Sequence, residues 1–180
     1  NKERMTHAFG LAGSQAAGTF AAWGTPTVKF HQCRGSLSGL MAAILAEQDF
    51  HSSKEILTAE DGGLYNSYSN GGKPQSAVKN LGVYWEFQQI ALRMWPAASG
   101  LQGMITALIN LVSKNQFLFD KIKNVKLSLS ETPYLMHGKF SKYKAKFEAL
   151  LSAHYTSAVI LRDRKLSLSQ FKPECYNNVV

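Results

Sequence analysis

A change in the spacing of apolar residues near residue 115 constrains most strongly what this chain can fold into. Before it, apolar side chains recur every three or four residues, most clearly from Ser99 to Lys114, which is the period of a helix. After it, from Ile122 to Ser130, apolar and polar residues alternate as in a half-buried strand. We therefore expect an α+β fold, with a mostly helical larger domain over residues 1–117 and the start of a smaller α+β domain over residues 118–180.

Local patterns predict the remaining elements. Small residues indicate a tightly packed helix, a Ser-x-x-Glu pattern indicates a capping box, and aromatic residues favour a strand. The predicted helices cover residues 7–22, Gln32 or Arg34 to Gln48, Lys54 to Thr58 with a cap formed by Ser52 and Glu55, and Lys142 to Asp163. The second of these helices is expected to bury Leu37, Leu40, Met41, Ile44 and Leu45. A short strand is predicted within residues 85–95, and a loop is predicted to hold Pro133, Tyr134 and His137.

The composition favours a globular protein. Hydrophobic residues make up 45% of the chain and charged residues 18%, and no apolar run approaches the roughly 20 residues that span a bilayer. The N-terminus lacks the apolar core of a signal peptide, so we expect no membrane partner and a cytoplasmic location. Because the chain opens inside what resembles a helix, we expect a piece of a longer protein.

Charge and cysteine content argue against two classes of site. The net charge is +8, but the cations are scattered and belong to no recognisable nucleic-acid-binding module, so we expect no nucleic-acid partner. Cys33 and Cys175 lie far apart and lack metal-ligand spacing, which predicts free thiols and no metal site. An anionic small substrate would also account for several of the cations.

The stretch from Thr25 to Ala46 places a cationic cluster, Lys29, His31 and Arg34, just ahead of the predicted helix, whose exposed start carries Ser36, Ser38 and Gly39. Free N–H groups and the helix dipole attract anions to a helix N-terminus. Cations hold carboxylates, and a histidine can transfer a proton. The stretch thus predicts an anion-binding site, although His31 taken alone could equally be a capping or core histidine.

Three stretches together resemble the MmgE/PrpD family. They are AFGLAGSQAAG with TPTVKFHQCRGSLSGLMAAILA, then IALRMWPAAS, then VKLSLSETPY followed by KFEALLSAHYTSAVILRD, and their order and spacing extend over residues 7–170. The resemblance implies a helical larger domain and an α+β smaller domain, with a di- or tricarboxylate bound in a cleft between them. It also implies a homodimer that works without a cofactor.

The resemblance carries over to individual residues. His31 matches the histidine of a family turn and Tyr134 matches a loop tyrosine, while Arg93 stands where some members have a lysine. Lys29 lies one position after the family lysine, whose place is taken by Val28. We therefore predict His31, Lys29 and Tyr134 as catalytic residues and Arg93 and Arg34 as substrate-binding residues.

The implied activity is that of a cofactor-independent lyase or isomerase. It would transfer a proton next to a carboxylate of a small di- or tricarboxylate, as an epimerase or a dehydratase does. The alternative is a non-catalytic fragment or a helical oligomerisation module of such a protein. His137 and His154 are interpreted as structural residues.

Overall fold

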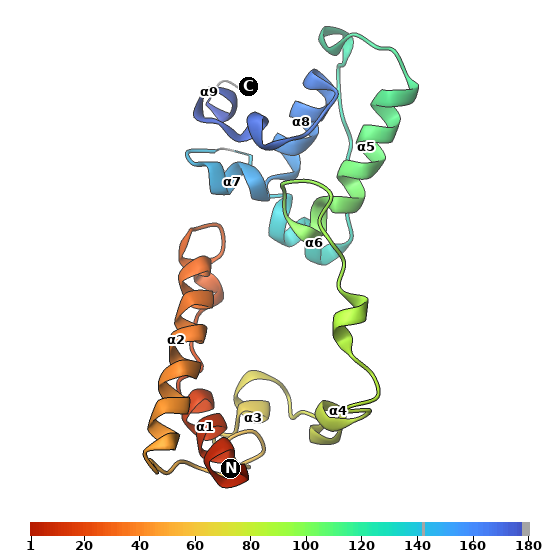
Figure 1. The fold of residues 1–180 in the computed structure, drawn as a ribbon. Helices are drawn as coiled ribbons and strands as arrows, with labels where there is room; N and C mark the ends of the chain where they lie inside the picture. The colour runs from red at the N-terminus through yellow and green to blue at the C-terminus, as the bar shows by residue number, and fades with distance from the viewer. Residues whose placement is uncertain (142, 178–180) are drawn as a thin grey trace. The chain divides into compact units, whose positions relative to one another are not determined.

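The computed structural model describes residues 1–141 and 143–177, and it divides the chain into two compact units, Asn1–Ile90 and Ala91–Val180 (Figure 1). The helices of the first unit are α1 (Lys2–Ser14), η1 (Phe20–Ala22), α2 (Thr27–Glu47), α3 (Leu64–Tyr68), α4 (Pro74–Val78) and η2 (Glu86–Gln89), where η marks a 3₁₀-helix. Those of the second unit are η3 (Ser99–Leu101), α5 (Gln102–Lys114), η4 (Phe119–Lys121), α6 (Glu131–His137), α7 (Lys146–Leu151), α8 (Ala153–Asp163), η5 (Leu168–Phe171) and α9 (Pro173–Tyr176).

The α+β prediction was wrong, because none of the residues described in these two units lies in a strand. The segment from Ile122 to Ser130 is extended, with Leu127 and Leu129 half-buried and Ser128 exposed between them. Alternation thus predicted correctly that Leu127 and Leu129 turn inward, but not the position of Val125, which is 44% exposed. It did not predict a sheet, because a strand also needs a neighbouring strand to bond with its backbone. The strand expected within residues 85–95 is likewise absent, and that region contains the short 3₁₀-helix η2.

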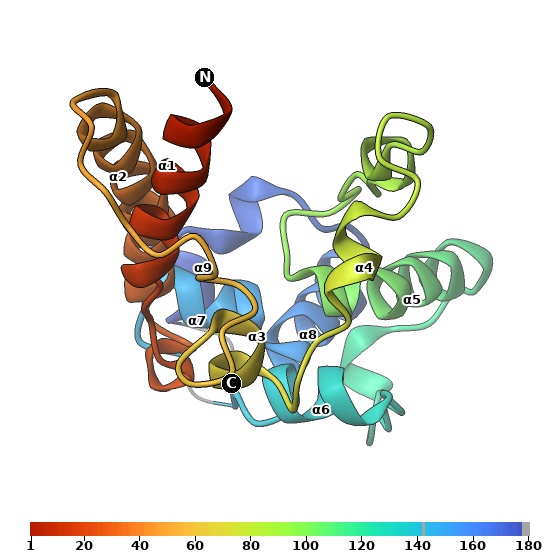
Figure 2. The same cartoon turned by 90° about the horizontal axis from the view of Figure 1, so that it is seen from below.

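In the first unit, α1 and α2 lie side by side as a helical hairpin (Figures 1 and 2). Leu11 of α1 packs on Ala42 and Ala46 of α2. Small residues allow this close approach, as the sequence indicated. The helix expected over residues 7–22 instead starts at Lys2 and ends at Ser14, and α2 begins at Thr27 rather than near Gln32.

The buried side of α2 differs from the prediction. Its buried residues are Ser38, Ala42 and Ala46, whereas the side chains of Leu37, Leu40, Met41 and Ile44 are 42–61% exposed. Within this unit α1 covers the side of α2 that carries small residues, so the row of larger side chains stays open. We call Leu37, Leu40, Met41 and Ile44 the apolar row of α2.

The predicted capping box of Ser52 and Glu55 does not form. The Ser52 hydroxyl donates to the backbone oxygen of His7 at 2.8 Å, and the Ser52 N–H donates to Nδ1 of His7 at 3.1 Å. The N–H of Glu55 bonds to Ser53 Oγ instead. Ser52 therefore fastens the chain after α2 onto α1, and residues 54–58 form turns rather than a helix.

The second unit is built on the packing of α5 against α8. The predicted helix from Ser99 to Lys114 is confirmed as η3 and α5, and Leu101, Ile105, Leu108 and Val112 are all buried. Because α5 packs on α8, it belongs to the second unit. The division between the compact units falls between Ile90 and Ala91. The domain boundary expected at residues 117 and 118 stays a prediction.

The long helix predicted from Lys142 to Asp163 is interrupted at Ser152, and Lys142 itself lies outside the described residues. The buried Ser152 side chain accepts a hydrogen bond from the N–H of Tyr155 at 3.0 Å and donates to the backbone oxygen of Phe140. Serine is a favourable N-cap, and here it starts α8 as a separate helix after α7.

Candidate functional site

The cationic cluster lies inside α2 rather than ahead of it. Lys29 is in the first turn of the helix, and His31 and Arg34 follow in the next. The N–H groups of Ser36, Ser38 and Gly39 are in mid-helix, where backbone partners already occupy them. The predicted anion site at a helix N-terminus is therefore wrong in its placement. An anion held by this cluster would therefore contact its side chains rather than free N–H groups of the helix.

The helix separates Lys29 from the other two cations. Residues three apart are neighbours on a helix surface, whereas residues two apart do not face each other. His31 and Arg34 therefore share a face, and Lys29 does not share it. Nη2 of Arg34 donates to Oε1 of Gln15 at 3.5 Å.

Gly18 lies directly against the imidazole of His31. A Cβ atom built on Gly18 would lie 3.0 Å from Nδ1 of His31, and the φ angle of Gly18 is +119°. Glycine adopts such a φ angle without strain and leaves space for the ring. The face formed by His31 and Arg34 thus lies over the connection from Gln15 to Gly18. We call it the His31–Arg34 face.

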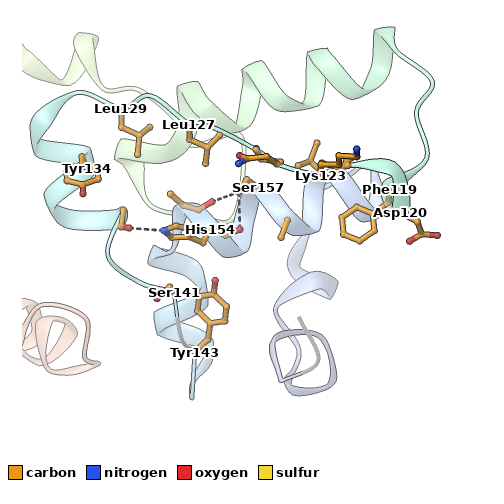
Figure 3. A pocket seen from close by; sticks show the side chains of 17 residues that line it. Phe119, Asp120, Lys123, Leu127, Leu129, Tyr134, Ser141, Tyr143, His154 and Ser157 are labelled. Carbon is orange, nitrogen blue, oxygen red and sulfur yellow. Dashed lines mark hydrogen bonds between the residues drawn. The ribbon is translucent and has the colours of Figure 1, made fainter. Parts of the chain in front are cut away.

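The other two predicted site residues belong to the second unit. Arg93 is exposed in the irregular segment before Trp95. Tyr134 lies on α6, where a loop was expected, and its side chain is 55% exposed. Tyr134 lines a pocket of about 760 Å³ within this unit (Figure 3).

This pocket lies between the extended segment 122–129 and α8 (Figure 3). Tyr134 is at one end, and Phe119, Asp120 and Lys123 are at the other. Leu127 and Leu129 line it from the extended segment. From α8 and the chain before it come Gly138, Ser141, Tyr143, Ala153, His154, Ser157, Ala158 and Leu161.

His154 is a pocket residue that the sequence interpretation missed. Its Nε2 lies 2.8 Å from the backbone oxygen of Gly138. A carbonyl can only accept a hydrogen bond, so the neutral ring carries its proton on Nε2 and leaves Nδ1 as an acceptor. The signal that could have revealed this position is the spacing of His154, Ser157, Ala158 and Leu161, which is that of one helix face.

His137, in contrast, is a buried structural residue. Its side chain is 3% exposed, and Nδ1 lies 2.9 Å from the backbone oxygen of Leu151. Burial lowers the pKa of His137 below its ordinary value. Gly100 lies close to the ring, since a Cβ atom there would be 3.1 Å from Nε2.

Comparison with known proteins decides the family. The chain matches the MmgE/PrpD N-terminal domain over residues 1–77 and the MmgE/PrpD C-terminal domain over residues 95–178. It belongs to the MmgE/PrpD family. A similar curated protein is the cis-aconitate decarboxylase-like protein oryM of Aspergillus oryzae, 27% identical over 186 residues that cover 95% of this chain. The chain spans 38% of the length of that relative.

The described part of the chain shows neither a cluster of metal ligands nor a membrane-spanning helix. Among residues 1–141 and 143–177, no three or more His, Cys, Asp or Glu side chains are grouped so that they could hold a metal ion. Within the same residues, every helix of this MmgE/PrpD chain is too short or too polar to cross a bilayer.

Proposed function

We propose that the protein is a lyase or isomerase that transfers a proton at the carbon next to a carboxylate of a small di- or tricarboxylate. Membership of the MmgE/PrpD family supports the enzyme class, and the cis-aconitate decarboxylase-like relative supports a carboxylic acid as substrate. The structural observation that carries the proposal is the His31–Arg34 face, where an imidazole and a guanidinium lie one helical turn apart.

These two side chains have complementary roles. The planar guanidinium of Arg34 can hold a carboxylate with two parallel hydrogen bonds. Removing the neighbouring proton places negative charge on that carboxylate, and a fixed cation stabilises the charge as it develops. The neutral imidazole of His31 takes the proton and returns it to the product. Gly18 limits where that ring can lie.

The remaining candidates, Tyr134, Arg93 and Lys29, would have supporting roles. Tyr134 would donate or accept a proton from the pocket of the second unit, and Arg93 would hold a carboxylate. Lys29 would contribute charge, although it lies on another side of α2 from His31. Dehydration and epimerisation begin with removal of a proton next to a carboxylate. Decarboxylation begins instead with loss of the carboxylate as carbon dioxide.

The first test uses NMR to measure how fast the full-length protein exchanges the protons of a panel of di- and tricarboxylates with D₂O. Arg34→Lys keeps the charge but loses the two-pronged hydrogen bonding, so KM should rise about tenfold. Arg162→Lys is the matched control, because Arg162 pairs with its neighbour Asp163 on α8. An unchanged KM in Arg34→Lys would remove Arg34 from the site, and no exchange with any acid would contradict the proposed function.

A second candidate function, an oligomerisation module, is favoured by the apolar row of α2. Exposed apolar side chains at helical spacing are typical of helix–helix interfaces. We propose that this row joins two copies of the protein in a homodimer. Leu40→Glu should then shift the sedimentation profile towards monomer, while Leu168→Glu, at an exposed leucine outside α2, should leave it unchanged. Identical profiles for both variants would exclude the row as the interface.

A further inference from the structure

We propose that His154 is a positioning residue, which fixes the ring of Tyr134 in the pocket of the second unit through the backbone of Gly138 (Figure 3). The proposal rests on the proposed function, because Tyr134 is a candidate for the proton chemistry. Tyr134 needs such support, since more than half of its side chain is exposed. A proton transfers efficiently only between groups held at a defined distance, so a mobile phenol would contribute little.

Gly138 directly follows α6 and lies against the ring of Tyr134. A Cβ atom built on Gly138 would be 2.8 Å from Cδ2 of Tyr134 and 3.1 Å from Cε2. The N–H of Gly138 caps the helix by donating to the backbone oxygen of Tyr134 at 2.8 Å. A shift of the Gly138 backbone would therefore change the space in which this ring can lie.

His154 holds the other side of Gly138. Its Nε2 donates to the backbone oxygen of Gly138 at 2.8 Å (Figure 3). On α8, His154 stands between the buried residues Ala153 and Tyr155, so its own backbone is anchored in the core of the unit. The imidazole also donates from Nε2 when it is charged, so this bond persists if Nδ1 takes up a proton. His154 thus fixes the Gly138 backbone relative to α8.

A different histidine holds α6 itself in place. Nδ1 of the buried His137 lies 2.9 Å from the backbone oxygen of Leu151, which joins the end of α6 to the chain just before α8. This contact does not involve His154, whose side chain is exposed. Loss of the His154 side chain should therefore leave α6 in place and release only Gly138 and the ring of Tyr134.

Fluorine NMR of the full-length protein labelled with 3-fluorotyrosine tests this placement, with the Tyr134 signal assigned by its loss in Tyr134→Phe. His154→Leu removes the donor, so the Tyr134 signal should move towards the chemical shift of free fluorotyrosine. His154→Gln keeps an N–H donor at a similar distance from the backbone and should retain the original shift. His51→Leu, which removes an exposed histidine from the first unit, is the matched control and should leave the signal unchanged.

Proton exchange provides a second measurement. His154→Leu should lower kcat about fivefold, because a hydrogen bond of ordinary strength is lost, and should leave KM within about twofold, because the groups that hold the acid are unchanged. His154→Gln should restore kcat.

Gly138→Ala reaches the same ring without changing His154. The φ angle of Gly138 is −77°, which alanine adopts without strain, but the added methyl group would displace the ring or the last turn of α6. This variant should also move the Tyr134 signal, even if His154→Leu fails to fold.

The outcomes separate this proposal from the proposed function. An unchanged Tyr134 signal in His154→Leu, or an equal shift in His154→Gln, would overturn the positioning role while leaving proton exchange by the unmodified protein intact. The expected shifts with no exchange of any acid would support the placement of Tyr134 by His154 and contradict the proposed function.

Discussion

His31→Asn should lower the rate of substrate proton exchange by the full-length protein by about 10²–10⁴-fold. Asparagine is polar and smaller than histidine, and it cannot take up and return a proton near neutral pH. The half-buried ring of His31 lies against Gly18, so the smaller amide should be accommodated without a change in fold. The rate is measured by NMR from the loss of the substrate proton signal in D₂O.

Cys33→Ser provides the control for this experiment. Cys33 is an exposed residue two positions after His31, so it points to another side of α2. The serine variant should retain the rate of the unmodified protein, and circular dichroism should show the same helix content for both variants. A His31→Asn rate within threefold of the original would exclude His31 as the proton carrier.

Tyr155→Ala should reduce the free energy of unfolding of the second unit by about 3–5 kcal/mol, as truncation of a buried aromatic side chain typically does. Tyr155 is fully buried on α8 and contacts Tyr143 and Phe171, with ring centroids 5.2 and 5.6 Å away. Its hydroxyl donates to the backbone oxygen of Gln170. Urea unfolding monitored by circular dichroism measures the change, and a loss below 1 kcal/mol would show that Tyr155 does not hold this core together.

Tyr155→Phe separates the hydroxyl from the ring. This variant should lose about 1–3 kcal/mol, since the ring stays packed but the Gln170 oxygen loses its partner. Burial raises the pKa of Tyr155 from 10.0 to about 12, so the folded state disfavours the ionised phenol. The resulting stability is present below pH 10 and disappears as the pH rises towards 12. Between pH 10 and pH 12, the free energy of unfolding of Tyr155→Phe should therefore fall less than that of the unmodified protein.

The sequence pattern was most accurate where the face of a helix that carries the large apolar residues is also the face that its partner covers. The helix from Ser99 to Lys114 was predicted with its buried residues because its apolar face packs on α8 of the same unit. The apolar row of α2 was predicted as buried because size and hydropathy suggested a core. Within the first unit α1 packs against small residues instead, which a periodicity argument cannot foresee.

The positions of the candidate site residues on their helices were only partly predictable from the sequence. The spacing of His31 and Arg34 holds in the structure, but the start of α2 at Thr27 moves Lys29 away from them. Pro26 disfavours helix only at the residue before it and is compatible with a helix start. His154 was missed because its place in the pocket depends on segment 122–129, which is far from α8 in the sequence.

Gly18 affects how mutational data on this protein should be interpreted. A scan scored on turnover would mark Gly18 as essential, since any side chain there would displace the imidazole of His31 or strain the backbone at a φ angle of +119°. Yet Gly18 has no side chain that could perform chemistry. Loss of activity at this position would therefore report on the placement of its neighbour, and only variants of His31 itself can assign a chemical role.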